Sequence, residues 1–190
     1  AELALTDHVF AASLSFLYWG TTPDAELLAA AERGELRDLG GRRQQVDRLV
    51  ADPRAREQFR HFATLWLGLE RLETIPKNAT QFPAFTPEIR ADLKEQTLRF
   101  VEYVVFEQNG TLEDLLTAPY TFLNAWRAGF FGGPGVSGDA LERVQDGSGR
   151  HVGLLGHASI LAATSHSAQP SPLLRGLFVR RNLLCHEFPP

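Results

Sequence analysis

The sequence contains no methionine and a single cysteine, Cys185, among its 190 residues. A lone cysteine cannot form an internal disulfide, so any disulfide partner of Cys185 would lie in another segment or protein. Because methionine is absent, the stretch does not begin at a translation start. The final Phe188-Pro189-Pro190 is typical of a sequence that leads into a further segment. We therefore expect the chain to be an internal part of a longer protein.

Long apolar runs and an excess of basic charge are also missing. No apolar run approaches the roughly 18 residues that a membrane-spanning helix needs, and no signal-peptide pattern heads the chain. The net charge of -4 disfavours a general binder of nucleic acid or of anionic membranes, since both select a basic surface. We expect neither a nucleic-acid partner nor a membrane span.

The short motifs that mark several enzyme classes are absent as well. The sequence has no glycine-rich phosphate loop, no G-x-S-x-G nucleophile elbow and no H-E-x-x-H zinc motif. It therefore identifies no catalytic residue directly, and whether the chain is an enzyme is left open.

What the sequence does contain is a series of helix starts. A hydroxyl or carboxylate capping residue followed by proline at the first helical position favours a helix start. Each such pair precedes an apolar stripe at helical spacing. No stretch shows sustained period-two alternation, so no sheet is expected. We predict an all-α fold, a single irregular bundle of about eight helices with long ordered loops. The capping pairs are Thr22-Pro23, Asp52-Pro53, Thr86-Pro87 and Ser171-Pro172.

Glycine is concentrated in one segment, residues 132–149, which holds G-G-P-G-V-S-G and D-G-S-G. We expect a helical domain over 1–131, a Gly-rich surface loop over 132–149, and a C-terminal helical pair over 150–190. The pair, whose first helix begins near Arg150, is expected to pack on the same core and to lead toward a downstream domain outside this chain. A second loop, at 74–86, contains Phe82 and Phe85, so we expect aromatic contacts to order it.

Candidate chemistry is concentrated in residues 149–190, which hold four of the six histidines and the cysteine. His157 and His166 are nine residues apart, which is not the spacing that places two ligands on one helical face, so no metal site is expected. His157 shares a helical face with Leu154 and Leu161 and is interpreted as a core histidine, with cofactor contact as the alternative. His166 follows the predicted helix end, where it could cap carbonyls, contact a haem edge, act as an axial ligand or shuttle a proton.

Cys185 and His186 resemble the end of a haem c attachment sequence, C-x-x-C-H, but Asn182 stands where the first cysteine is required. A structural cysteine, buried or paired outside this segment, is therefore the preferred interpretation, and single-cysteine haem attachment is the alternative. Arg175 could bind a haem propionate or form an internal salt bridge, and we prefer the salt bridge. Gly176, in the middle of a predicted helix, suggests close packing against a helix or a planar group.

Taken together, five stretches resemble the planctomycete-type surface and cytochrome-associated helical domains of unknown function that occur in large secreted bacterial proteins. The resemblance covers nearly all of the chain and spans two adjoining family segments. The stretches that carry it are L-S-F-L-Y-W-G-T-T-P-D-A-E-L-L-A-A-A-E-R-G-E-L (14–36), F-A-T-L-W-L-G-L-E-R-L (62–72), F-V-E-Y-V-V-F-E-Q-N-G-T-L-E-D-L-L-T-A-P-Y-T-F-L-N (100–124), G-L-L-G-H-A-S-I-L-A-A-T-S-H (153–166) and S-P-L-L-R-G-L-F-V-R-R-N-L-L-C (171–185).

The resemblance implies that haem c is bound in an adjoining segment beyond residue 190, with none in this chain, and that the protein is periplasmic or extracellular.

Our leading hypothesis is a helical scaffold and interaction module whose partners are other domains of the same polypeptide, or redox proteins, in electron transfer. One alternative is part of a haem-dependent redox enzyme with His166 and Arg175 at the site. The other is a carbohydrate or polymer binder that uses the aromatic loop at 74–86. A scaffold should bury His166 against a partner, an enzyme should leave it in an open polar pocket, and a binder should expose Phe82 and Phe85 in a row.

Overall fold

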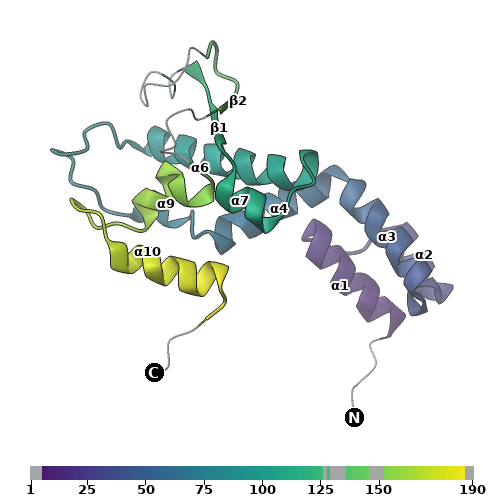
Figure 1. The fold of residues 1–190 in the computed structure, drawn as a ribbon. Helices are drawn as coiled ribbons and strands as arrows, with labels where there is room; N and C mark the ends of the chain where they lie inside the picture. The colour runs from purple at the N-terminus through teal and green to yellow at the C-terminus, as the bar shows by residue number, and fades with distance from the viewer. Residues whose placement is uncertain (1–5, 126–127, 129–135, 146–151, 187–190) are drawn as a thin grey trace. The chain divides into compact units, whose positions relative to one another are not determined.

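A computed structural model describes residues 6–125, 128, 136–145 and 152–186. The chain forms two compact units, Ala1–Phe62 and Ala63–Pro190, whose boundary falls inside a helix and is not marked by any change in composition. The structure is predominantly helical, which confirms the predicted fold class (Figure 1). Among the helices described, none combines the length and the apolar character that crossing a membrane requires. The division into 1–131, 132–149 and 150–190 stays a prediction.

The first unit consists of α1 (Asp7–Trp19), α2 (Ala25–Glu32), the 3-10 turn η1 (Glu35–Arg37), α3 (Leu39–Ala51) and most of α4 (Pro53–Trp66). The predicted start of the second helix at Thr22-Pro23 is two residues early. Asp24 is the N-cap residue instead, and its Oδ1 accepts the Leu27 amide at 2.9 Å. A carboxylate at this position satisfies one of the free amides of the first turn.

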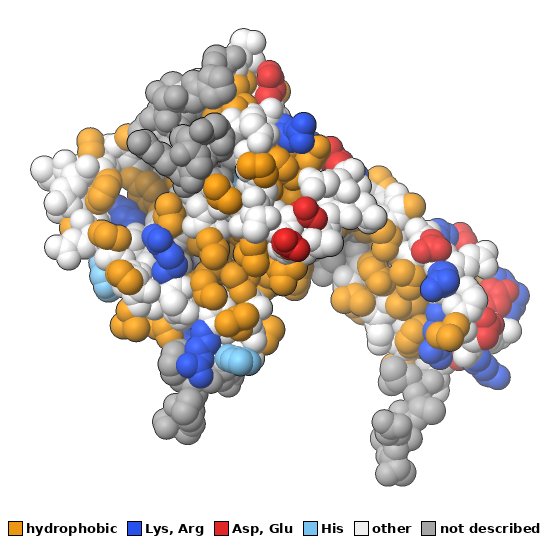
Figure 2. All heavy atoms as spheres, in the orientation of Figure 1, with side chains coloured by type: hydrophobic (Ala, Val, Ile, Leu, Met, Phe, Trp, Pro, Cys, Tyr) orange, Lys and Arg blue, Asp and Glu red, His pale blue; other side chains and the backbone are white. Residues whose placement is uncertain are grey.

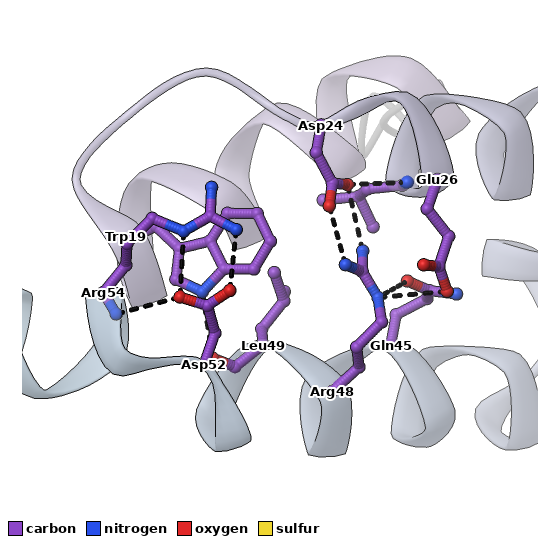
Figure 3. Close-up of polar contacts among 9 residues, drawn as sticks. Trp19, Asp24, Glu26, Gln45, Arg48, Leu49, Asp52 and Arg54 are labelled. Carbon is purple, nitrogen blue, oxygen red and sulfur yellow. Dashed lines mark hydrogen bonds and ion pairs between the residues drawn. The ribbon is translucent and has the colours of Figure 1, made fainter.

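Trp19 is the anchor of this unit (Figure 3). Its side chain is buried, and the indole Nε1 donates to the Leu49 carbonyl oxygen of α3 at 2.9 Å. The Arg54 guanidinium lies 3.5 Å from the centre of the indole ring and donates to both carboxylate oxygens of Asp52, at 2.7 and 2.9 Å. The hydrogen bonds from Arg54 lower the pKa of Asp52 to about 2. One tryptophan thus connects α1, α3 and the start of α4.

A second polar cluster connects α2 to α3 (Figure 3). Arg48 of α3 donates to Asp24 Oδ2 at 2.7 Å and to Oδ1 at 3.0 Å, and its Nε lies 3.2 Å from a Glu26 oxygen. The hydrogen bonds from Arg48 lower the pKa of Asp24. Because Asp24 also caps α2, a single carboxylate fixes both the start of that helix and its approach to α3.

The second unit is arranged around its longest helix. It contains α5 (Arg71–Thr74), α6 (Pro87–Glu102) with the π-helical turn η2 (Tyr103–Glu107), and α7 (Leu112–Thr117), followed by β1 (Tyr120–Leu123) and β2 (Glu142–Gln145). Next come the 3-10 turn η3 (Leu154–Gly156), α9 (Ala158–Ala163), and α10 (Pro172–Phe178), which continues as the π-helical turn η4 (Val179–Leu183). The predicted starts at Pro87 and Pro172 are confirmed. α6 contributes buried Phe100 and Val101 and packs against α5, β1 and α9.

The expectation of no sheet is wrong, because β1 and β2 form a two-stranded antiparallel sheet in which Tyr120 pairs with Gln145 and Leu123 with Glu142. All four residues of β1 are buried, so the strand has no polar side and shows no alternation. β2 lies within the segment predicted as a loop. A further helix predicted over 124–131 falls mostly outside the described residues.

The helix predicted from Arg150 through the region of His157 is interrupted. Gly153 has φ 58°, and its amide donates to the Ala118 carbonyl oxygen at 2.9 Å. A Cβ at Gly153 would collide with the backbone of Leu116, so only glycine fits there. His157 is extended, with φ -65° and ψ 135°, so it precedes α9 as the N-cap residue and is not inside a longer helix.

Candidate functional site

The core of the second unit contains a small polar cluster around His157. Thr97 Oγ1 of α6 donates to the Leu93 carbonyl oxygen at 3.2 Å, and lies 3.0 Å from His157 Nδ1 and 2.6 Å from Ser159 Oγ. The Thr97 hydroxyl thus joins α6 to His157 and Ser159 in the core of the second unit. The His157 ring is 2% exposed and packs 4.6 Å from the Phe100 ring. The geometry favours a core histidine over a cofactor contact.

A second histidine, His166, lies at the surface, where the aromatic loop meets the turn after α9. The Lys77 ammonium donates to the carbonyl oxygens of Ala162 and His166 at 3.0 and 2.9 Å, and to Ser165 Oγ at 2.6 Å. The turn itself is closed by a bridge between Ser165 and Pro170. Burial and the neighbouring positive charge of Arg90 lower the pKa of Lys77. Lys77 thus joins two segments that are far apart in the sequence.

The aromatic loop is ordered along its length, as predicted. The Asn78 amide donates to the Ser167 carbonyl oxygen at 2.9 Å, and the Asn78 carbonyl oxygen accepts the amide of Phe82 at 2.8 Å. Arg90 of α6 places its guanidinium 4.6 Å from the centre of the Phe85 ring. The contacts that hold the loop are therefore backbone hydrogen bonds and a cation–π contact to Phe85.

Between this loop and the turn lies a pocket of about 320 Å³, which we call the aromatic pocket. Its charged and titratable lining residues are Lys77, His166 and Arg175, and no acidic residue is among those the structure places around it. Phe82 and Phe85 form part of its wall. The structure therefore brings two of the predicted site residues, His166 and Arg175, into one open pocket.

A larger depression of about 750 Å³, which we call the α10 groove, runs along α10 and η4. Arg175 borders both cavities. A Cβ added at Gly176 would meet nothing within 4 Å, and Leu173 and Leu184 of the same segment are 73% and 59% exposed. Figure 2 shows hydrophobic, arginine and histidine side chains over this segment. The groove is lined by Pro170, Pro172, Arg175, Gly176, Val179, Arg180, Leu184 and His186.

The charged residues between 151 and 186 are all basic. No aspartate or glutamate occurs between residues 151 and 186, although the whole chain carries a net charge of -4. Arg175, Arg180 and Arg181 all fall in this stretch. Among the described residues, Arg175 makes neither an ion pair nor a side-chain hydrogen bond, so the internal salt bridge expected for it does not form within that part of the chain. No described carboxylate therefore competes with an anion for its guanidinium.

The remaining candidates lie at the end of η4. Cys185 is exposed, with φ 52°, and has no disulfide partner among the described residues. Of the two forms of the structural interpretation, the buried one is therefore excluded, and pairing outside this segment stays a prediction. His186 lines the α10 groove. Asn182, which replaces the first cysteine of a haem motif, instead exchanges two hydrogen bonds with Trp66: Nδ2 donates to the Trp66 carbonyl oxygen at 2.5 Å, and Trp66 Nε1 donates to the Asn182 carbonyl oxygen at 2.6 Å.

No cluster of three or more His, Cys, Asp or Glu side chains able to hold a metal ion occurs in the part of the chain that the structure describes. The sequence reasoning missed Lys77 and Arg180 as lining residues. The absence of acidic residues between 151 and 186 was the available signal for a cationic surface. Nothing in the sequence marked Lys77, because its contacts join segments about 85 residues apart.

Two family models match the chain. The model described as protein of unknown function DUF1592 (PSD4) matches residues 5–132, and that described as protein of unknown function DUF1588 (PSCyt3) matches residues 151–190. No curated protein and no solved structure matches the chain. The first match covers more than half of the 190 residues. The chain therefore belongs to the DUF1592 family, with a DUF1588 segment after it, and both are planctomycete cytochrome-associated domains of unknown function.

Proposed function

We propose that this protein is a helical interaction module of a larger secreted polypeptide, which docks an adjoining c-type cytochrome unit on the α10 groove and assists electron transfer. The cytochrome-associated family context supports the kind of partner. The observation that carries the proposal is the α10 groove itself, an apolar depression bordered by Arg175, Arg180 and His186 and lacking acidic residues among its described lining. The proposal places the protein in the periplasm or outside the cell.

The chemistry of a haem edge matches this lining. A porphyrin presents a flat apolar rim and two propionate carboxylates. Val179 and exposed Leu184 supply apolar surface, and a guanidinium such as that of Arg175 can bind a carboxylate with two parallel hydrogen bonds. Apolar contact at the centre with charged groups at the rim is the usual anatomy of a protein interface.

Gly176 adds a second argument. Glycine inside a helix costs about 1 kcal/mol relative to alanine, and the described chain gives no packing reason for it, since a Cβ there would meet nothing within 4 Å. A partner that approaches the helix backbone closely would supply the reason. Gly176 lines the α10 groove, so the absence of a side chain there leaves the helix backbone open to a partner.

The first test is a visible absorption spectrum, with pyridine haemochrome analysis, of the full-length native protein and of the 190-residue chain expressed alone. The proposal expects haem c in the full-length protein and none in the 190-residue chain. Haem bound covalently by the 190-residue chain would instead assign attachment to Cys185 and His186. A full-length protein without haem would refute the cytochrome partnership.

The aromatic pocket favours a second candidate, a haem-dependent redox enzyme with His166 and Arg175 at its site. Exposed His166 lies in an open pocket with Lys77, Gln169 and Arg175, the arrangement expected of an active site. A scaffold would instead bury this histidine against a partner. Under this candidate, His166→Asn in the full-length protein would abolish substrate-dependent reduction of the haem, and Arg181→Gln, outside both cavities, would not. Equal haem reduction in both variants would refute it.

A further inference from the structure

We infer that the aromatic pocket is a binding site for a small organic anion, in which a carboxylate lies against Arg175 and a ring or other flat apolar group packs against Phe82 and Phe85. This inference concerns a small ligand held by this chain alone, and it is tested on the 190-residue chain, in which no cytochrome unit competes for Arg175.

The first support is the state of the two cations that line the pocket. The ammonium of Lys77 donates to three oxygens of the chain, which accounts for all of its protons. The guanidinium of Arg175, which carries five N–H donors, lines the pocket and makes no ion pair or side-chain hydrogen bond with the described residues. Lys77 therefore positions the wall and adds positive charge, while Arg175 is the group that can bind a carboxylate in bidentate fashion.

The second support is the apolar part of the lining. Phe82 is 46% exposed, so its ring is accessible to a ligand, and Leu161 and Pro170 complete an apolar wall. Gln169 and Ser165 supply the few polar atoms. A mostly apolar cavity with a small number of convergent polar groups is the common composition of small-molecule sites.

The third support is that the pocket is built before any ligand arrives. Lys77 and Asn78 fasten the aromatic loop to the turn that carries His166, and the Asn78 side chain accepts the amides of Thr80 and Gln81 at 2.9 and 3.2 Å. Arg90 donates to the carbonyl oxygens of Leu72 in α5 and of Ile75 at the start of the loop, at 2.7 and 2.9 Å. Binding to such a preformed wall requires little additional ordering.

The size of the pocket limits the ligand. A cavity of about 320 Å³ lies at the lower end of the range for small-molecule sites. It fits a single ring with its substituents and excludes a folded domain. The pocket would recognise one carboxylate attached to one ring. Two classes of compound have this feature, aromatic acids and acidic sugars.

The test is calorimetric titration and saturation-transfer NMR on the 190-residue protein with four probes arranged as two matched pairs. Benzoate is compared with benzyl alcohol, and galacturonate with galactose, so that within each pair the principal change is the loss of the carboxylate charge. We expect saturable binding of at least one carboxylate, and binding at least about tenfold weaker for its neutral partner, because a hydrogen bond to a charged group is worth about that factor or more. The pair that binds identifies the source of the carboxylate.

Three single-residue variants test whether the carboxylate binds in the aromatic pocket. Arg175→Gln should weaken carboxylate binding about tenfold to a hundredfold. Arg181→Gln, the same charge change on the same helical segment but outside both cavities, should leave it unchanged. Phe82→Ala should weaken charged and neutral probes alike. Circular dichroism of each variant checks that it is folded.

Two results would overturn the inference. One is the absence of saturable binding by either carboxylate to the wild-type protein. The other is equal weakening by Arg175→Gln and Arg181→Gln, which would show only general attraction to positive charge. Neither result depends on haem, so failure here is distinguishable from failure of the docking proposal.

Discussion

Replacing Gly176 by alanine has opposite predicted effects in the isolated chain and in the full-length protein. In the isolated chain, the added methyl group meets nothing within 4 Å, and alanine is favoured over glycine in a helix by about 1 kcal/mol. The free energy of unfolding should therefore rise by up to about 1 kcal/mol, which corresponds to roughly 2–4 °C in Tm for a chain of this size. Urea unfolding followed by circular dichroism measures the change.

Gly153→Ala provides the matched control. Gly153 has φ 58°, and a Cβ there would collide with the backbone of Leu116, so the same chemical change should destabilise the protein. A Gly176→Ala variant that is also destabilised would show that the space above Gly176 is occupied, which would refute the reasoning about the α10 groove.

In the full-length protein, the extra methyl group occupies space that we assign to the docked cytochrome unit. Gly176→Ala should then weaken docking and increase exposure of the α10 segment, and Gly176→Trp should do so more strongly. Leu112→Trp, at a 52% exposed position on α7, is the control for a bulky surface residue. Limited proteolysis within 172–186 reports the exposure of the segment. An unchanged proteolysis rate in Gly176→Trp would contradict docking at this face.

Three further predictions concern the two units. Trp19→Phe removes the indole donor to a buried carbonyl and should lower the free energy of unfolding by about 1–3 kcal/mol by urea titration, whereas Tyr18→Phe should have little effect. Thr97→Val removes the hydroxyl that three core groups contact and should cost about 1–3 kcal/mol, most of which Thr97→Ser restores. The lowered pKa values of Asp24 and Asp52 add stability that is complete above their usual pKa, near pH 4, and is lost as the pH falls through the lowered values, which for Asp52 is about 2. Unfolding midpoints between pH 5 and pH 2 should therefore fall less steeply in an Asp52→Asn variant, and an unchanged slope would contradict the assignment.

The sequence predicted helices best where a cap and a proline coincide. The starts at Pro53, Pro87 and Pro172 lie as predicted, because proline at the first helical position gives up no hydrogen bond and fixes φ in the helical range. The start at Pro23 was wrong because Asp24, one residue later, offers a carboxylate to the amide of Leu27. Local chemistry decides these boundaries, so the errors are small.

The sheet and the interrupted helix depend on distant residues. Buried β1 has no alternation to recognise, and Gly153 breaks the helix only because the backbone of Leu116 passes close to it. The candidate site likewise depends on a residue that is distant in the sequence. His166 and Arg175 could be named from the sequence, but Lys77 joins their pocket from a segment about 85 residues earlier, and no local pattern signals that contact.

The most direct test of the docking account is amide hydrogen exchange of residues 172–186 in the 190-residue chain and in the full-length native protein. Docking of a cytochrome unit on the α10 groove predicts slower exchange of this segment in the full-length protein, with residues 7–19 of α1 exchanging equally in both. Equal exchange of 172–186 in the two proteins would show that nothing covers the groove and would contradict the proposed function.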